Sequence, residues 1–206
     1  AEEYGEVPQE DIPIIDRTML QPVNPYAVSK IAQDLIGFVY YKSYGLNVIR
    51  TRAFNHEGPR RDNVFGISWY AYQIARIERG LQKPIIRTGL RDDRRNFMHV
   101  RDLVRAYWLA IQKCKPGKLY LIGADEKAHI YTFDEALQKL ISMSTYKDKM
   151  KVVVDPEFVR PTSVPRLIAD STEFRNLTGW KPKVSFQTVL ADTLNFWRVF
   201  LDKGLY

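Results

Sequence analysis

The sequence is poor in cysteine and histidine. Its 206 residues contain one cysteine, Cys114, and three histidines, His56, His99 and His129. A single cysteine cannot form a disulfide within these residues, so a reducing compartment is the simplest assignment and we expect a cytoplasmic protein. The histidines show no ligand spacing with Cys114, and we therefore expect no structural metal site.

Long apolar runs and glycine-rich turns are also missing. No apolar run approaches the ~20 residues that span a membrane, and the acidic residues 1–13 lack the basic-then-apolar layout of a secretory signal. We therefore expect no membrane partner. The eleven glycines are scattered, and none forms the G-x-G-x-x-G turn that binds the phosphates of a dinucleotide. A sequence that opens at Ala1 without such a turn looks cut, so we expect an N-terminal half to be missing.

Uninterrupted basic segments are absent too, although the net charge is +7. Arginines gather at residues 58–63 and 89–97, and both segments also contain acidic residues. Nucleic-acid binding usually needs a continuous basic face with aromatic platforms or a recognised module, so we predict no nucleic-acid partner. Arginines in short loops better suit a small anion held by guanidinium groups. A solvated basic surface is the alternative explanation for part of this charge.

The sequence does have an apolar content of 45%, enough to bury the core of one or two globular units. Helical spacing and short β-branched runs alternate along it. Alternation at these lengths predicts an α/β fold with parallel strands. Two of the four tryptophans, Trp108 and Trp180, are expected in the core. The predicted helices cover residues 26–41, 68–80, 99–114, 132–144 and 186–201, and the predicted strands cover 46–55, 83–89, 118–123 and 151–155.

The segment PVNPYAVSK, residues 22–30, contains a tyrosine and a lysine four positions apart. On the predicted helix, Tyr26 and Lys30 lie one turn apart on the same side, so their polar ends can meet. An ammonium group near a phenol favours the phenolate and lowers the pKa of a phenol from about 10 toward neutrality. Such a pair can act as a general acid or base on a carbonyl or an alcohol. The alternative is a packed tyrosine at a helix start with a solvated lysine one turn later.

Six segments of the sequence carry motifs that are more specific together than any one alone. They are AEEYG (1–5), PVNPYAVSK (22–30), RTRAFNHEGPRR (50–61), RRNFMHVRDLVRAYW (94–108), DPEFVRPTSVPRL (155–167) and TGWKP (178–182). Together they resemble the extended short-chain dehydrogenase/reductase family that acts on nucleotide sugars. Within that family they are most similar to GDP-4-dehydro-6-deoxy-mannose reductases, and next to GDP-mannose 4,6-dehydratases. The resemblance covers essentially the whole chain and corresponds to the C-terminal part of a complete member.

The resemblance implies a fold, a domain organisation and an assembly. The fold would be the C-terminal part of a Rossmann-like doubly wound parallel sheet plus a smaller α/β substrate-binding domain. Residues 1–60 would be the remainder of the dinucleotide-binding domain, with 83–123 interleaved between the domains, and 61–206 would be mainly substrate-binding. A homodimer would form through a bundle of the helix after Tyr26 and the helix around residues 99–114.

The resemblance also implies catalytic roles. Tyr26 would protonate the sugar C4 oxygen while NADP(H), or possibly NAD(H), exchanges hydride at C4. Lys30 would bind the nicotinamide ribose and support the acidity of Tyr26. Glu2 stands where dehydratases carry a general acid or base that removes water across C5 and C6, although an ordinary charge at a strand end is an equal alternative.

The remaining candidate residues would handle the cofactor and the substrate. The resemblance implies that Asn55 contacts the substrate diphosphate and that nearby backbone faces the nicotinamide, which gives Phe54, Asn55 and His56 as cofactor-binding candidates. Arg61 is a further candidate, because it could support the cofactor phosphates, with a subunit contact as the alternative. A turn-forming asparagine and a packed histidine are the alternatives. Asn55, Arg95 and Arg160 are the substrate-binding candidates, because two arginines can hold the two phosphates of GDP. Asn96 departs from the family pattern, in which an aspartate usually follows Arg95.

Three functions remain open at this point. The first is an NADP(H)-dependent reductase acting on the C4 ketone of a GDP-4-dehydro-6-deoxy-hexose, and the second is a GDP-mannose 4,6-dehydratase. The third is a non-catalytic fragment, because the phosphate-binding turn and the family's Ser or Thr partner of Tyr26 are not in these residues. For the same reason we expect residues 1–206 alone to show no NADPH oxidation.

Overall fold

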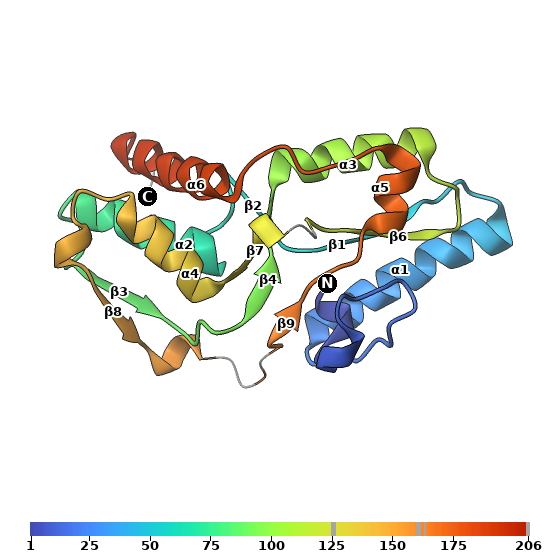
Figure 1. Ribbon diagram of the computed structural model, residues 1–206, viewed down its shortest axis with the longest axis horizontal. Helices are drawn as coiled ribbons and strands as arrows, with labels where there is room; N and C mark the ends of the chain where they lie inside the picture. Colours follow the sequence, from blue (N-terminus) through green and yellow to red (C-terminus); the bar gives the residue numbers. More distant parts are fainter. Residues whose placement is uncertain (125–126, 160–161, 163, 205–206) are drawn as a thin grey trace.

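The computed structural model describes residues 1–124, 127–159, 162 and 164–204, and the candidate Arg160 lies outside these residues. Figure 1 shows an elongated molecule in which helices cover small sheets of short strands. The helices are α1 (Pro25–Tyr44), α2 (Gly66–Glu78), α3 (Val100–Lys113), α4 (Phe133–Ser142), α5 (Thr172–Thr178) and α6 (Phe186–Asp202), with the 3₁₀ turns η1 (Glu2–Tyr4), η2 (Gln9–Asp11), η3 (Lys127–His129), η4 (Lys147–Lys149) and η5 (Pro156–Phe158). The strands are β1 (Arg50–Ala53), β2 (His56–Glu57), β3 (Ile85–Thr88), β4 (Arg94–Asn96), β5 (Met98–His99), β6 (Leu119–Ile122), β7 (Ile130–Thr132), β8 (Lys151–Val154) and β9 (Arg166–Leu167).

One half of the molecule is built on the parallel pair β1–β6, with α1 and α3 on opposite faces of it (Figure 1). Side chains alternate between the two faces of a strand. Arg50 and Arg52 point to the α1 side, where both hydrogen-bond Asp34. Thr51 points to the α3 side, where it hydrogen-bonds Tyr107. Within one chain the sheet therefore separates these two helices, and the homodimer expected through a bundle of both stays a prediction.

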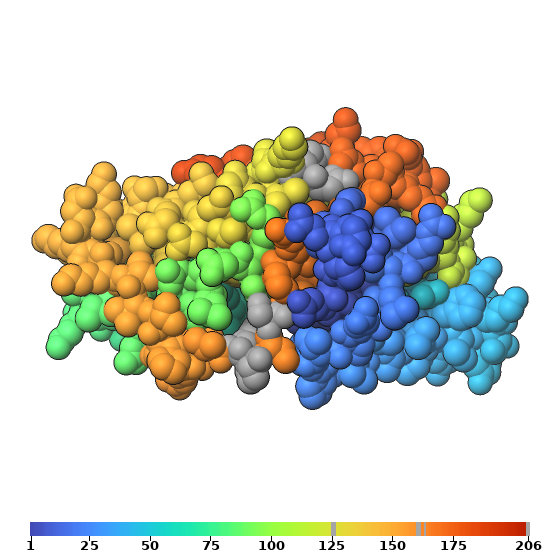
Figure 2. Space-filling model, turned by 60° about the horizontal axis from the view of Figure 1, so that its bottom comes forward, coloured from blue at the N-terminus to red at the C-terminus, as the bar shows by residue number. Residues whose placement is uncertain are grey.

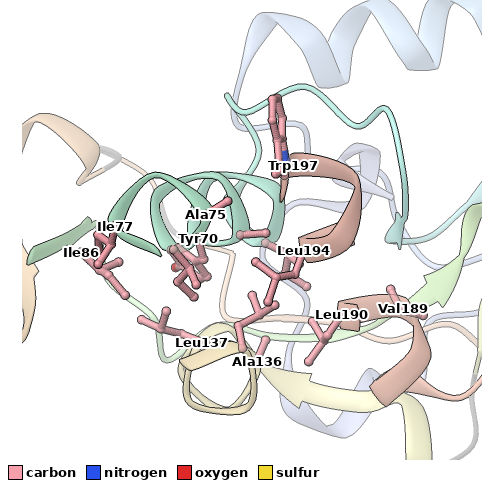
Figure 3. Close-up of a cluster of buried hydrophobic side chains, with 14 of the residues drawn as sticks. Tyr70, Ala75, Ile77, Ile86, Ala136, Leu137, Val189, Leu190, Leu194 and Trp197 are labelled. Atoms are coloured by element: carbon pink, nitrogen blue, oxygen red, sulfur yellow. The ribbon is translucent and has the colours of Figure 1, made fainter. Parts of the chain in front are cut away.

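The other half is a helical layer of α2, α4 and α6 with the parallel pair β3–β8 beside it. Figure 3 shows side chains of the three helices meeting in one buried cluster, with Tyr70, Leu137 and Leu194 among them. Trp197 of α6 donates from Nε1 to Ser68 Oγ of α2 at 2.9 Å, which satisfies a buried indole N–H inside an otherwise apolar contact. In Figure 2 the first 44 residues (blue shades) form a continuous surface at one end of the molecule, opposite the segments around β8 (orange).

Between the halves lie two further small sheets. β2 pairs with β5 in parallel, and β4 is flanked by β9 in parallel and by β7 in antiparallel orientation. The expectation of parallel strands therefore holds for most pairs and fails for β4–β7. Strand β7 was not predicted, because its three residues are too short to show an alternating pattern.

Local sequence signals explain the helix ends. Asn24 accepts a hydrogen bond from Ala27 N and caps α1, which Gly45 ends in the left-handed conformation at φ 68°. Thr132 and Glu135 form a capping box at the start of α4. Helix α2 begins at Gly66, before the predicted start at residue 68, and its N-cap residue Phe65 makes no side-chain cap hydrogen bond. No helix within the described ranges is long and apolar enough to cross a bilayer.

Two predictions from the sequence pattern are wrong, one on the length of strand β1 and one on the burial of Trp108. Strand β1 is shorter than the predicted 46–55, because Val48 N bonds back to Leu46 O and forms a turn instead of a ladder. Trp180 is completely buried as predicted, but Trp108 is 62% exposed, and Val104 and Ile111 beside it are also exposed. Part of the apolar side of α3 is therefore not covered by any other part of the described structure.

Candidate active site

The structure brings Tyr26 and Lys30 together at the start of α1. The Lys30 ammonium lies 5.8 Å from the centre of the Tyr26 ring, and Lys30 Nζ also donates to Gln33 Oε1 at 2.9 Å. Tyr26 is 60% exposed, so a ligand can reach its phenol. The helical spacing therefore produced the expected pairing, while the catalytic role of the pair stays a prediction.

Glu2 joins the same end of α1 through a residue that the sequence analysis missed. Asn24 donates from Nδ2 to Glu2 Oε2 at 3.2 Å, and its Oδ1 accepts from Ala27 N at 2.8 Å. The carboxylate is thereby placed beside the first turn of α1, which also carries Tyr26. The local signal for Asn24 was its N-cap position before Pro25, which predicts the cap but not the contact with Glu2.

A buried charged network fixes this arrangement from behind. Asp34 lies two turns after Tyr26 and binds Arg50 and Arg52, with N–O distances of 2.5 Å to each. Arg52 also donates to the hydroxyl of Tyr4 at 2.9 Å, so it connects α1 to η1. Burial acts to raise the pKa of Asp34, but hydrogen bonds from Arg50 and Arg52 outweigh it and the pKa is lowered. Burial raises the pKa of Tyr4 to about 12 against the opposing charge of Arg52.

Asn55 follows the carboxyl end of β1, where parallel sheets place ligand contacts. Its Oδ1 is buried and has no hydrogen-bond partner within the described structure, which suits a polar group of a ligand. Phe54 is buried, with its ring against Tyr4, and its backbone N–H donates to Ile122 O at 2.8 Å. His56 Nδ1 lies 3.0 Å from Phe54 O, and burial lowers the pKa of His56. These observations fit the proposed packed histidine better than a catalytic one.

Arg61 is directed toward a buried carboxylate that sequence analysis did not identify. Arg61 Nε lies 3.9 Å from Glu57 Oε2, and its guanidinium stacks on Phe65 at 3.5 Å from the ring centre. Glu57 is buried on β2 beside His99 of β5, and burial raises its pKa to about 7. No local pattern predicts this burial, because a glutamate between a histidine and a glycine is typical of a loop.

Replacing Glu57 by glutamine should flatten the pH dependence of stability above the ordinary titration range of glutamate. Because the pKa rises from 4.5 to about 7 on folding, the folded state holds this proton more tightly than the unfolded state. The free energy of unfolding should therefore fall by about 3 kcal/mol as the pH rises through this window, and Glu57→Gln should remove that fall. Urea unfolding at several pH values measures it.

The exposed Glu10 provides the matched control for this prediction. Glu10→Gln should leave the pH dependence of the unfolding free energy as it is in the unsubstituted protein. An unchanged slope in Glu57→Gln would show that Glu57 is not a buried carboxyl group that titrates near neutral pH.

The two predicted phosphate-binding arginines are not seen together, because Arg160 lies outside the described residues. Arg95 is buried on β4, where it donates to Arg94 O at 3.0 Å and lies 3.3 Å from Asp93 Oδ2. A phosphate would have to compete with Asp93 for this guanidinium. The adjacent Asn96 is fully buried, and both polar atoms of its amide lack a partner in the part of the chain that is described.

Comparison with known proteins identifies the family to which these residues belong. The family profile described as GDP-mannose 4,6 dehydratase matches residues 1–193. The chain belongs to this family. The resemblance inferred from the motifs is thus confirmed at the family level.

Curated relatives of the GDP-mannose 4,6 dehydratase family include both enzyme types expected from the motifs. The GDP-6-deoxy-D-mannose reductase of Pseudomonas aeruginosa is 30% identical over 194 residues, which are 94% of this chain and 62% of the reductase. GDP-mannose 4,6 dehydratase 1 of Arabidopsis thaliana is 30% identical over 190 residues, 92% of this chain and 50% of the relative. The chain therefore spans about half to three fifths of the length of these relatives.

Solved structures of related sugar enzymes have the same fold. The structure of RMD from Pseudomonas aeruginosa complexed with NADPH superposes with a TM-score of 0.87 at 28% identity, covering 97% of this chain and 64% of that chain. A dTDP-glucose 4,6-dehydratase from Bacillus anthracis in complex with NAD gives a TM-score of 0.80 at 25% identity, covering 100% of this chain and 62% of that chain. The α/β fold class expected for this family member is confirmed.

Proposed function

We propose that the protein carrying this chain is an NADP(H)-dependent oxidoreductase that reduces the C4 ketone of a GDP-4-dehydro-6-deoxy-hexose. The observation that carries the proposal is the exposed Tyr26 with Lys30 one turn away, at the same helix end as Glu2. The reductase from Pseudomonas aeruginosa and the NADPH named with its structure support the reaction and the cofactor. Because other structural neighbours hold NAD, NAD(H) is the alternative cofactor.

The proposed roles follow from what each side chain can donate or accept. Tyr26 gives its phenolic proton to the C4 oxygen, and Lys30, one helical turn away, binds the nicotinamide ribose of the cofactor. NADP(H), when bound, supplies the hydride for C4. Asn55, with its unpartnered Oδ1 after β1, accepts a hydrogen bond from a ligand group. Arg95 and Arg160 bind the diphosphate. To do so, Arg95 replaces its contact with Asp93 by a contact with a phosphate.

A 4,6-dehydratase is the second candidate function, and Glu2 is the observation that favours it. A dehydratase needs an acid or base to remove water across C5 and C6, in addition to the proton exchange at C4. Glu2 is bonded to the cap of the helix that carries Tyr26, so both groups can act on one sugar. GDP-mannose 4,6 dehydratases among the relatives are consistent with this alternative.

Two substrates separate these functions in the full-length protein that carries this chain. A reductase should oxidise NADPH in the presence of GDP-4-dehydro-6-deoxy-mannose and should be inert toward GDP-mannose. A dehydratase should convert GDP-mannose without added reductant. Absence of turnover with both substrates would contradict the proposed enzyme.

We also propose the homodimer, with α1 in its interface. Large apolar side chains of α1 are exposed at helical spacing, with Val28, Leu35, Ile36 and Val39 along one stripe. A contiguous apolar stripe of this kind usually marks an interaction surface. We propose the domain division as well, with residues 1–60 as the remainder of the dinucleotide-binding domain, 83–123 interleaved between the domains and 61–206 mainly substrate-binding.

The mass of the full-length protein in solution tests the proposed dimer. Leu35→Glu should convert a dimer to a monomer in sedimentation, because it places a charge in the centre of the stripe. The same substitution at the exposed Leu90, outside α1, serves as control and should leave the mass unchanged. A wild-type monomer would contradict the proposal.

A further inference from the structure

Asn24 makes two hydrogen bonds whose directions are fixed by the backbone. Its Oδ1 faces the backbone N–H of Ala27 at 2.8 Å, and only the oxygen of an amide can accept this hydrogen. The Nδ2 group is thereby directed to Glu2 Oε2 at 3.2 Å, where it can only donate. One side chain therefore caps α1 and holds the carboxylate of the preceding η1 turn.

The backbone around Glu2 is fixed independently of this contact. Glu3 and Tyr4 are buried, and Arg52 lies against both of them. Gln21 N donates to Glu3 O at 3.1 Å, which ties η1 to the segment that leads into α1. Glu2 itself is only half-buried, so its side chain can rotate unless a partner holds it. Asn24 is the partner that the structure places on its carboxylate.

We propose that Asn24 is a positioning residue that holds the Glu2 carboxylate in one orientation, toward the substrate beside Tyr26. This inference rests on the second candidate function, in which Glu2 acts on the sugar that reacts beside Tyr26. A hydrogen bond donated to a carboxylate fixes one of its oxygens, so the carboxylate keeps one orientation through the reaction.

Substitutions that retain the helix cap separate positioning from stability. Serine and aspartate cap helices about as well as asparagine, so Asn24→Ser and Asn24→Asp should leave the thermal unfolding midpoint nearly unchanged. Neither can donate from an amide to Glu2, and aspartate places a second carboxylate beside it. We expect kcat of the full-length protein to fall about tenfold in Asn24→Ser with little change in KM.

Asn24→Asp should have a larger effect and a distinct pH signature. The acid limb of its pH–kcat profile should move to higher pH by about one unit, because two adjacent carboxylates do not both ionise readily. Asn24→Gln keeps an amide that can donate to Glu2, so its kcat should be higher than that of Asn24→Ser and Asn24→Asp. Ser185→Ala removes the cap of α6 far from Glu2 in sequence, and it should lower the unfolding midpoint without a change in kcat.

A spectroscopic measurement decides the inference even if the proposed reaction is wrong. In full-length protein labelled with ¹³C at glutamate carboxyl groups, the Glu2 signal should titrate at higher pH in Asn24→Asp than in the unsubstituted protein. The side-chain amide protons of Asn24 should shift as Glu2 titrates. If neither occurs, or if kcat and its pH profile are unchanged in both variants of an active enzyme, the positioning role is refuted. Inactivity of the unsubstituted protein with both sugar nucleotides would instead refute the proposed function and leave the titration to decide on Asn24.

Discussion

Replacing Tyr26 by phenylalanine should lower kcat of the full-length enzyme by about 10²–10⁴-fold, the range for losing a general acid or base. The substitution removes only the phenolic hydroxyl. Because the ring is 60% exposed and belongs to no core cluster of the described structure, the fold should stay intact. NADPH oxidation, or GDP-mannose conversion if the enzyme is a dehydratase, measures the effect. KM should change little, because the proton is needed in the transition state rather than for binding.

A second tyrosine of the same helix provides the control for Tyr26→Phe. Tyr44 is the last residue of α1 and is 70% exposed, so Tyr44→Phe removes an equally accessible hydroxyl at the opposite helix end. It should leave kcat unchanged. A Tyr26→Phe enzyme with full activity would overturn the proposed mechanism, whichever of the two reactions the protein performs.

The helices could be predicted from the sequence because their signals are local. A spacing of three and four residues sets the face of α1, and Thr132 with Glu135 marks the start of α4 within a single turn. The short strands at the centre depend on partners far along the chain. β4 binds β7 on one side and β9 on the other, and no pattern within three residues specifies either partner or its direction. The exposure of Trp108 has the same origin, since amphipathicity shows which side of a helix is apolar but not how much of it is covered.

In the candidate site, too, contacts within one helix could be predicted from the sequence, whereas contacts between distant segments could not. Tyr26 and Lys30 meet because a helix brings positions four apart together, and this geometry follows from spacing alone. Asn24 and Glu2 are separated by 22 positions, and their contact depends on how the first residues fold back over α1. The burial of Glu57 likewise depends on packing between β2 and its neighbours. Residues that hold or tune a site through nonlocal contacts were therefore missed, whereas those that form it within one helix were found.

Asp34→Ala should destabilise the protein by about 3–5 kcal/mol, the range for removing one partner of a buried ion pair. Asp34 is the carboxylate that neutralises both Arg50 and Arg52, and its side chain is 8% exposed. Without it, the guanidinium of Arg52 remains buried beside Tyr4, and the more distant Glu3, at 3.8 Å, is the counter-charge left to it among the described residues. Urea unfolding at neutral pH measures the loss in the free energy of unfolding. The enzymatic activity that depends on Tyr26 should fall as well, because the same network holds α1 against η1.

The pH dependence gives this prediction a second signature and a control. The pKa of Asp34 is lowered on folding, so the unfolded state binds its proton more readily. Its contribution is therefore present at neutral pH and is lost as the pH falls through the titration range of a carboxylate, and Asp34→Ala should weaken this acid sensitivity. Asp134→Ala breaks the more exposed pair with Arg91 and should cost at most about 1 kcal/mol. Equal losses in the two variants would mean that the network behind Tyr26 behaves as a surface ion pair and does not fix the helix that carries the site.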